Sequence, residues 1–383
     1  MHPIRIHKVI SLMNSMFYRF GFWHRGVEPT VEEIRVKFFY CIYYSFYVLS
    51  LVIGSIKCQK MGESIYLADL SVGAFVVCVK VWILVWKQDE IINLLDRVCV
   101  FLIRNYGDHN RFNEKHEGFI KFVIVFVMIV IITGLSVVFL SFTGKEKKLF
   151  LGIGFPLDYK NSDIAFWIAT IFIFIGVLLS IVAIFFTTVI WYLLFMCTLR
   201  YEVLGSELKN MGRIDESGNG KMTVRQMRNH FFEDVKRSIV AHLHLTGLTS
   251  DVESFILDLF LIQFGTSGLC ICGSVYCLAF DVGDNLLERV LHIFVLIYFI
   301  AELFMITYFG NEIMLSSNRL SYSLFESEWY DQPQSTKTNI LIFGEYLKQS
   351  QVLVIGKLYP LTLETFTRIL NSAYSMFNIL KSF

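Results

Sequence analysis

The sequence predicts an all-α membrane protein with seven transmembrane helices, on the basis of its composition, its long uncharged segments and the distribution of its Lys and Arg residues. Hydrophobic residues make up 55% of the 383 residues, charged residues make up 17%, and the mean hydropathy is +0.56. Soluble proteins carry about 25% charged residues, so this chain has too little polar surface for a water-soluble body of its size. The net charge of +1 offers no basic field to attract phosphates, which excludes a nucleic-acid binder.

Apolar segments long enough to cross a lipid bilayer recur along the chain. A hydrocarbon core about 30 Å thick requires about 20 helical residues. In chain order, the expected spans are residues 38–56, 66–86, 122–142, 164–199, 259–280, 290–309 and 361–380. The fourth segment is uncharged over 36 residues and contains a single potential helix breaker, Gly176. We therefore expect one long helix there, projecting beyond the bilayer.

Two of the first six expected spans contain charged residues. Asp69 and Lys80 lie in the second span, and Glu302 lies in the sixth. Lysine side chains can extend toward an aqueous interface, so we expect Lys80 to reach the cytoplasmic end of its helix. Glu302 is expected to be a hydrogen-bonding group inside the bundle.

The distribution of Lys and Arg predicts the orientation of these spans. Segments on the same side as the N-terminus contain 22 of these residues, and segments on the opposite side contain 8. This asymmetry predicts a cytoplasmic N-terminus and an extracellular C-terminus. The chain is therefore expected to have six parts. They are an N-terminal amphipathic segment (1–37), spans one to four (38–199), a cytoplasmic loop with an anchor helix (200–254), spans five and six (255–309), a cytoplasmic loop with the anchor piece of the last helix (310–356), and the pore-lining part of the last helix (357–383).

The N-terminal segment begins with an amphipathic pattern. Its apolar side chains recur at helical spacing, at Val9, Leu12, Met13, Met16, Phe17 and Phe20. This pattern predicts a short helix lying on the membrane surface.

The last expected span, 361–380, is half polar. One face is apolar, with Leu363, Phe366, Leu370, Ala373, Phe377 and Leu380, and the other is polar, with Glu364, Arg368, Asn371, Ser375 and Asn378. Polar groups facing hydrocarbon are costly, so this polar stripe must face water, another helix or another subunit. A helix buried in its own bundle is one interpretation, and a helix beside an aqueous path is the one we favour. One such helix per chain cannot enclose a pore, so the second interpretation requires an oligomer.

The sequence carries no recognisable signature of an enzyme, a cofactor or a metal site. The eight cysteines are scattered, mostly in apolar stretches, and none has a His at zinc-ligand spacing. Asp96-Arg97-Val98 is similar to the acidic–arginine pair of G-protein-coupled receptors, but it follows the second span and the expected orientation is opposite to theirs. A G-protein-coupled receptor and a secondary transporter are the alternatives to a channel, and no internal repeat supports the transporter.

Short stretches in the C-terminal part carry a resemblance to a known family. They are HLHLTGLTSDVE (242–253), YFGNEI (308–313), the Ser317 region, FESEWYD (325–331), LIF (341–343), GKLYPLTLETF (356–366) and AYSMFNIL (373–380). This succession resembles the insect odorant receptor family. The resemblance implies a ligand-gated, non-selective cation channel in the plasma membrane of olfactory neuron dendrites, formed as a heterotetramer with the odorant receptor co-receptor. The short loop between spans four and five and the AYSMF pattern look like those of a tuning receptor.

The resemblance also implies where the functional residues lie. The last helix would line the pore, with Ser375 and Asn378 on its polar face and an apolar gate at Ile379 and Phe383. A volatile ligand has few polar atoms, so its site should be an aromatic-lined cavity with one or two donors. In the family, this cavity lies in the outer half of the bundle, which here places Leu70, Gly73, Ala74, Phe75, Val138, Phe139, Phe142, Phe172, Phe294 and Tyr298 around the ligand, with Tyr298 as the donor.

Overall fold

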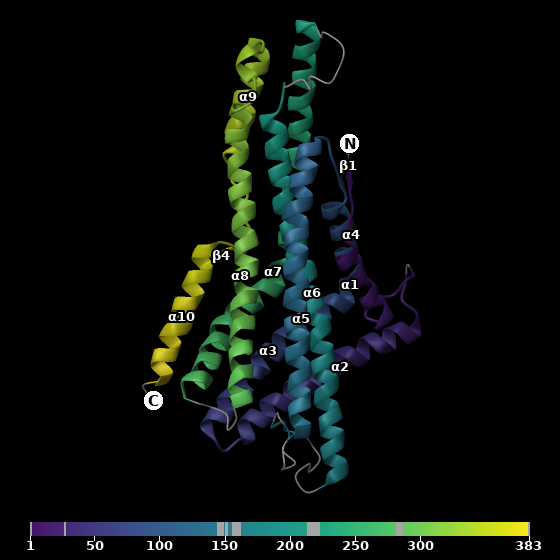
Figure 1. Ribbon diagram of the computed structural model, residues 1–383, viewed down its shortest axis with the longest axis vertical. Coiled ribbons are helices and arrows are strands. Elements are labelled where there is room, and N and C mark those ends of the chain that lie inside the picture. The colour runs from purple at the N-terminus through teal and green to yellow at the C-terminus, as the bar shows by residue number, and fades with distance from the viewer. Residues whose placement is uncertain are drawn as a thin grey trace.

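The protein is described here from a computed structural model covering residues 2–26, 28–143, 149, 152–154, 162–212, 223–280 and 286–381, with side chains for all of these except 137–143, 286–288 and 291. The described chain is an all-α bundle with two minor two-stranded sheets, which confirms the predicted fold class (Figure 1). Its elements, in order, are β1 (His2–Ile4), α1 (Lys8–Arg19), α2 (Val31–Lys57), α3 (Met61–Trp86), α4 (Gln88–Cys99), β2 (Phe101–Ile103), α5 (Tyr106–Thr143), α6 (Asp163–Lys209), α7 (Val224–Ala279), α8 (Leu286–Phe325), a 3₁₀ turn (Trp329–Asp331), α9 (Gln334–Leu347), β3 (Val354–Ile355), β4 (Tyr359–Pro360) and α10 (Leu363–Lys381).

Six of the described helices are long and apolar enough to cross a membrane, namely α2, α3, α5, α6, α7 and α8. The first six expected spans fall on these helices in order, and the seventh falls on α10, which is not among the six. The helices also extend well beyond the expected spans, because α5 begins at Tyr106 and α7 at Val224. A capping box between Thr223 and Gln226 starts α7, since the Thr side chain accepts from the Gln N–H and the Gln side chain accepts from the Thr N–H.

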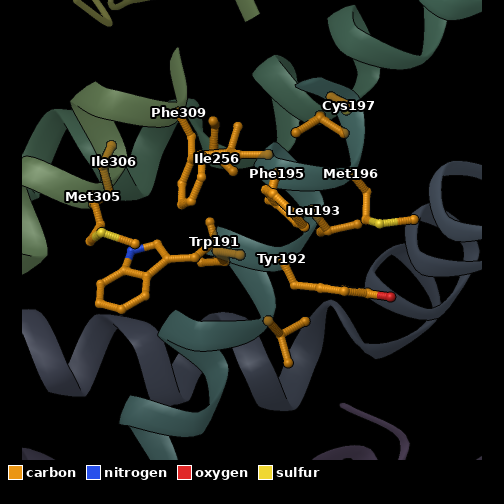
Figure 2. Close-up of a cluster of buried hydrophobic side chains, with 14 of the residues drawn as sticks. Trp191, Tyr192, Leu193, Phe195, Met196, Cys197, Ile256, Met305, Ile306 and Phe309 are labelled. Atoms are coloured by element: carbon orange, nitrogen blue, oxygen red, sulfur yellow. The ribbon is translucent and has the colours of Figure 1, made fainter. Parts of the chain in front are cut away.

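Helix α6 occupies the centre of the bundle. Every residue from 182 to 199 is buried, so other helices surround this segment on all sides (Figure 2). Gly176 does not interrupt the helix, and its missing side chain has a packing role. A Cβ at Gly176 would lie 2.7 Å from the Tyr47 ring of α2, so the glycine permits a close approach between the two helices.

The N-terminal segment forms the predicted helix, α1, and one face of this helix packs on the bundle. Its apolar residues Ile10, Met13 and Phe17 are buried within the protein core. Thr188 of α6 lies 3.3 Å from the Met13 sulfur, and the His7 N–H donates to the Tyr192 hydroxyl at 3.3 Å. Leu12 and Phe20 of the same helical segment are 59% and 52% exposed, so the predicted contact of α1 with the membrane surface stays a prediction.

A short hairpin connects α9 to α10. Gly356 and Lys357 both have positive φ, as in a type I′ turn, and the Leu358 N–H donates to the Ile355 carbonyl at 3.1 Å. The hairpin is fastened to α7, because the Val354 N–H donates to a Glu253 carboxylate oxygen at 2.8 Å. It therefore fixes the point at which α10 begins.

Candidate functional site

An ion pair between Lys80 of α3 and Glu302 of α8 lies in the core of the bundle. The Lys80 ammonium donates to Glu302 Oε1, and Lys80 is 1% exposed, so the prediction that Lys80 reaches the cytoplasmic interface was wrong. A lysine in an apolar span can extend toward the interface or pair with an opposite charge inside the bundle. Here the Glu302 carboxylate on the neighbouring helix supplies the opposite charge. Thr187 of α6 also donates to Glu302 Oε1, at 3.3 Å. The pair thus connects α3, α6 and α8.

A series of aromatic contacts leads from Glu302 to α5 and α6. The Tyr298 ring, one turn before Glu302 on α8, lies 6.1 Å from the Phe126 ring of α5, and its hydroxyl is within hydrogen-bonding reach of Glu302. The Phe126 ring lies 4.9 Å from the Trp191 indole of α6. Residues of α3, α5, α6 and α8 therefore meet around one charged pair. We call Lys80, Phe126, Thr187, Trp191, Tyr298 and Glu302 the core polar cluster.

Several of the residues expected around a ligand point in different directions. Phe75 is 46% exposed and Phe294 is 39% exposed. Phe172 faces α2 instead, with its ring 5.2 Å from Tyr43, whose hydroxyl donates to the Phe172 carbonyl. Successive helical positions differ by 100°, so Gly73 and Phe75 cannot face the same neighbour.

The other expected ligand residues are partly placed by the structure. Leu70 and Ala74 are half-buried and pack against the core. A Cβ at Gly73 would lie 3.0 Å from the Phe299 ring, so Gly73 faces α8 next to Tyr298. The side chains of Val138, Phe139 and Phe142 lie outside the described residues. Of the expected residues, Tyr298 is thus a member of the core polar cluster, and Gly73 packs on Phe299, the next residue along α8.

The polar stripe of α10 faces away from the bundle. All of its members are exposed: Glu364, Arg368, Asn371, Ser375 and Asn378. Arg368 Nη2 lies 2.6 Å from Glu364 Oε1, so these two residues form an ion pair along the stripe. The opposite face packs against the bundle, with Ala373 buried and the Phe366 ring 5.5 Å from Phe304 of α8. The interpretation that the polar face is buried in its own bundle is therefore wrong.

The expected gate residue Ile379 lies near the last residue of α10. Ile379 is 60% exposed, and it follows Ser375 by four residues and Asn378 by one. Four residues correspond to about one helical turn, so the Ile379 side chain lies on nearly the same face of α10 as Ser375. Phe383 lies outside the described residues. Figure 1 shows α10 on the flank of the bundle beside α8, with its last residues directed toward the same end as the last residues of α7.

Sequence reasoning missed the partners within the core polar cluster. Opposite charges in two apolar spans were a usable signal, since charges in a membrane interior pair with one another. Nothing in the sequence marked Thr187, Trp191 or Phe126, which lie within long apolar runs. Among the described residues, no three His, Cys, Asp or Glu side chains come together as a metal site.

Six long apolar helices, a charged pair buried in their core and a half-polar helix on their flank define a multi-pass membrane receptor or channel. The sequence matches the 7tm Odorant receptor family over residues 60–374, which is most of its length. The chain belongs to this odorant receptor family. A family of receptors agrees with the expectation that the chain is not an enzyme.

Relatives from insects agree with this assignment. Odorant receptor 23a of Drosophila melanogaster is 28% identical over 68% of this chain and 65% of its own length. Odorant receptor Or2 of Anopheles gambiae is 22% identical over 48% of this chain and 49% of its own length. Odorant receptor 94a of Drosophila melanogaster is 22% identical over 84% of this chain and 81% of its own length. This chain thus matches less than two thirds of the first two relatives and about four fifths of the third.

A solved structure shares the fold across almost the whole chain. The insect olfactory receptor OR5 from Machilis hrabei in complex with eugenol superposes with a TM-score of 0.80 over 98% of both chains, at 13% sequence identity. A second structure of the same receptor superposes with a TM-score of 0.72 over 97% of this chain and 98% of that chain, at 12% sequence identity. The arrangement of helices in this chain is therefore that of an insect olfactory receptor.

Proposed function

We propose that this chain is a tuning odorant receptor subunit that binds a volatile molecule and opens a non-selective cation channel formed with the odorant receptor co-receptor. The assembly is a heterotetramer in the plasma membrane of olfactory neuron dendrites. In it, the N-terminus is cytoplasmic and the C-terminus is extracellular. The three relatives and the two structures named above as odorant or olfactory receptors support odorant binding. The partner and the conduction mechanism are part of the proposal.

The exposed polar stripe of α10 is the observation that carries the channel proposal. In a lipid bilayer, each exposed charged or amide group facing hydrocarbon is unfavourable, and α10 presents five such polar residues on one face. Its apolar face is already used against α7 and α8. Water-filled space between subunits satisfies the polar face, and four such helices around an axis enclose a path for ions. Ser375 and Asn378 then line this path.

The gate is proposed at the end of α10. An apolar ring of Ile379 and Phe383 excludes ions in the closed state, because a narrow apolar constriction loses its water. Opening then requires only that the helices separate enough for the constriction to become wet.

Subunit contacts are proposed at the cytoplasmic ends of the long helices, within residues 200–254 and 310–356. Large apolar side chains are exposed there, including Val240 and Leu243 of α7, Tyr322 of α8, and Leu341 and Ile342 of α9. These helix ends extend beyond the apolar spans, where water would otherwise cover them. An exposed apolar surface of this kind is typical of an interaction site.

The ligand is proposed to bind where α3, α5, α6 and α8 meet, in the half of the bundle that contains Gly73 and Tyr298. The expected pocket residues Leu70, Ala74, Val138, Phe139 and Phe142 belong to two of these helices, α3 and α5, and their contact with a ligand is part of the proposal. Aromatic side chains stack with aromatic odorants at little entropic cost.

Co-expression tests this proposal. The chain is expressed alone and with the co-receptor, and whole-cell current is recorded during application of a panel of volatile compounds. We expect odorant-evoked cation current only in the pair, without added G protein. Surface labelling confirms that the chain reaches the plasma membrane in both cases. Full odorant-evoked current from the chain alone would contradict the partner, and no current from the pair at normal surface levels would contradict the channel.

A further inference from the structure

We infer that the core polar cluster is the polar end of the ligand site and that it selects volatile molecules with an oxygen acceptor, such as ketones, aldehydes and esters. This inference rests on the proposed odorant-binding function and specifies the class of ligand. It depends on hydrogen-bond donors that are buried around Glu302 and are not fully used.

Lys80 provides the first unused donors. An ammonium group has three N–H donors. Within the part of the chain that the structure describes, the Lys80 ammonium donates to one acceptor, Glu302 Oε1, although the residue is 1% exposed. Two buried N–H groups on a charged nitrogen are expensive to leave without an acceptor. An oxygen atom supplied by a bound molecule would satisfy them.

Trp191 provides an independent donor. Its side chain is fully buried, and its indole N–H has no hydrogen-bond partner among the described residues. Trp191 follows Thr187 by one helical turn, so both side chains lie on the same face of α6. Figure 2 shows the nitrogen edge of the indole toward Met305, which follows Glu302 by three residues on α8. A thioether is a weak acceptor, so the indole N–H remains available.

The contacts among these residues close into one ring. Thr187 bonds to Glu302, Glu302 lies one turn from Tyr298, Tyr298 packs on Phe126, and Phe126 packs on Trp191. Trp191 returns to Thr187 along α6. The unused donors of α3 and α6 therefore belong to one region of the buried core, together with the aromatic rings of Phe126, Trp191 and Tyr298. This arrangement fits a molecule with one polar end and an apolar body.

The balance of donors and acceptors decides which polar end fits. Glu302 already accepts from Lys80 and Thr187 and has the Tyr298 hydroxyl within reach, so its carboxylate has little capacity left. The groups without a partner in this region are hydrogen-bond donors, and a carbonyl oxygen can accept hydrogen bonds from them. An amine is mostly protonated at pH 7 and would place a second positive charge beside Lys80. A hydrocarbon would leave the donors unsatisfied.

The test compares molecules that share a carbon skeleton. Acetophenone, ethylbenzene and 1-phenylethylamine form one set, and 2-heptanone, heptane and 2-aminoheptane form another. Each is applied to cells that express the chain with the co-receptor, and current is recorded over a range of concentrations. Binding to the purified receptor is measured in parallel from the change in tryptophan fluorescence, which does not require the channel to open.

We expect the ketone of at least one set to bind and to evoke current at lower concentration than the hydrocarbon and the amine. Trp191→Phe keeps an aromatic ring and removes the N–H donor. This variant should raise the half-maximal concentration of the ketone about 5-fold, because it removes one neutral hydrogen bond. The half-maximal concentration of the hydrocarbon should stay unchanged. The matched control is Trp82→Phe, since Trp82 lies on the exposed side of α3 and is 49% exposed. It should change neither value.

Lys80→Met combined with Glu302→Met removes both charges while keeping the side-chain volume similar, so this variant retains a packed core. It should abolish the preference for the ketone over the hydrocarbon at normal surface expression. Equal potency of ketone, hydrocarbon and amine in the original chain would overturn the inference and leave the proposed function intact. Ketone binding without current in the pair would overturn the channel function and leave the inference intact. No binding of any ketone would overturn the inference.

Discussion

Replacing Gly310 with alanine should loosen the junction between α8 and α10. Gly310 is buried on α8, and a Cβ placed there would lie 2.3 Å from the Leu361 Cβ and 2.7 Å from the Leu361 carbonyl oxygen. The second atom is backbone, so no side-chain rotation relieves the overlap. Leu361 is itself fully buried, and its N–H donates to the Leu353 carbonyl at 2.8 Å, so the hairpin must move as a unit.

The cost follows from two opposing effects. Forcing one extra methyl group into a packed core costs about 1–3 kcal/mol, and a rigid backbone neighbour favours the upper end of this range. Alanine in place of glycine in a helix contributes about 1 kcal/mol of stability. The net expectation is a loss of about 2 kcal/mol. Because the hairpin sets the start of α10, we also expect altered resting or odorant-evoked current.

The assay is thermal unfolding of the detergent-solubilised receptor, followed by fluorescence-detected size-exclusion chromatography. Gly265→Ala is the matched control, because Gly265 lies in α7 and its added Cβ would meet no atom within 4 Å. The midpoint should fall by a few degrees for Gly310→Ala and stay the same or rise for Gly265→Ala. Equal midpoints for the two variants would refute the packing account of the α8–α10 junction.

Three further outcomes are expected. Lys80→Met alone should destabilise the receptor by about 3–5 kcal/mol, because it leaves the Glu302 charge buried without a partner. Adding Glu302→Met should recover most of this loss in the same thermal assay. A double variant that is no more stable than the single one would contradict this expectation. An epitope tag before Met1 should be hidden from antibody on intact cells and a tag after Phe383 should be visible, and the reverse labelling would contradict the proposed orientation. Ile379→Ser should increase the current without odorant, since a polar ring stays hydrated, and an unchanged resting leak at normal surface expression would show that Ile379 is not part of the gate.

Sequence reasoning succeeded where a single helix carries its own signal. The uncharged run at 164–199 indicated one continuous helix, and α6 extends without interruption from Asp163 to Lys209. The alternation of polar and apolar residues along 361–380 indicated two faces, and α10 presents those faces to solvent and to the bundle respectively. In both cases the determining pattern lies within one segment, where the helical repeat of 3.6 residues converts it directly into geometry.

Sequence reasoning failed where the outcome depends on which segments meet. No local pattern in the sequence indicated that α1 packs on α6, or that Lys80 meets Glu302 across 222 positions of sequence. Pairing between distant helices has no trace in local composition, so a single sequence provided the charges without their partners.

The exposed stripe of α10 is the basis of the proposed channel, and modification of introduced cysteines tests it most directly. Ser375→Cys places a thiol on the polar face, and Ala373→Cys places one on the buried face of the same helix. The background variant carries Cys58→Ser, because Cys58 is half-buried whereas the other native cysteines are buried. Burial also raises the pKa of the Cys99 thiol well above its ordinary value, which keeps that thiol unreactive.

The measurement is odorant-evoked current in cells that express each variant with the co-receptor, before and after a positively charged methanethiosulfonate reagent is applied from outside with odorant. A charged adduct in a water-filled cation path repels permeating ions. We predict an irreversible loss of current for Ser375→Cys and no change for Ala373→Cys. Unchanged current for Ser375→Cys, with labelling of the thiol verified on the isolated receptor, would contradict the claim that α10 of this chain lines the ion path.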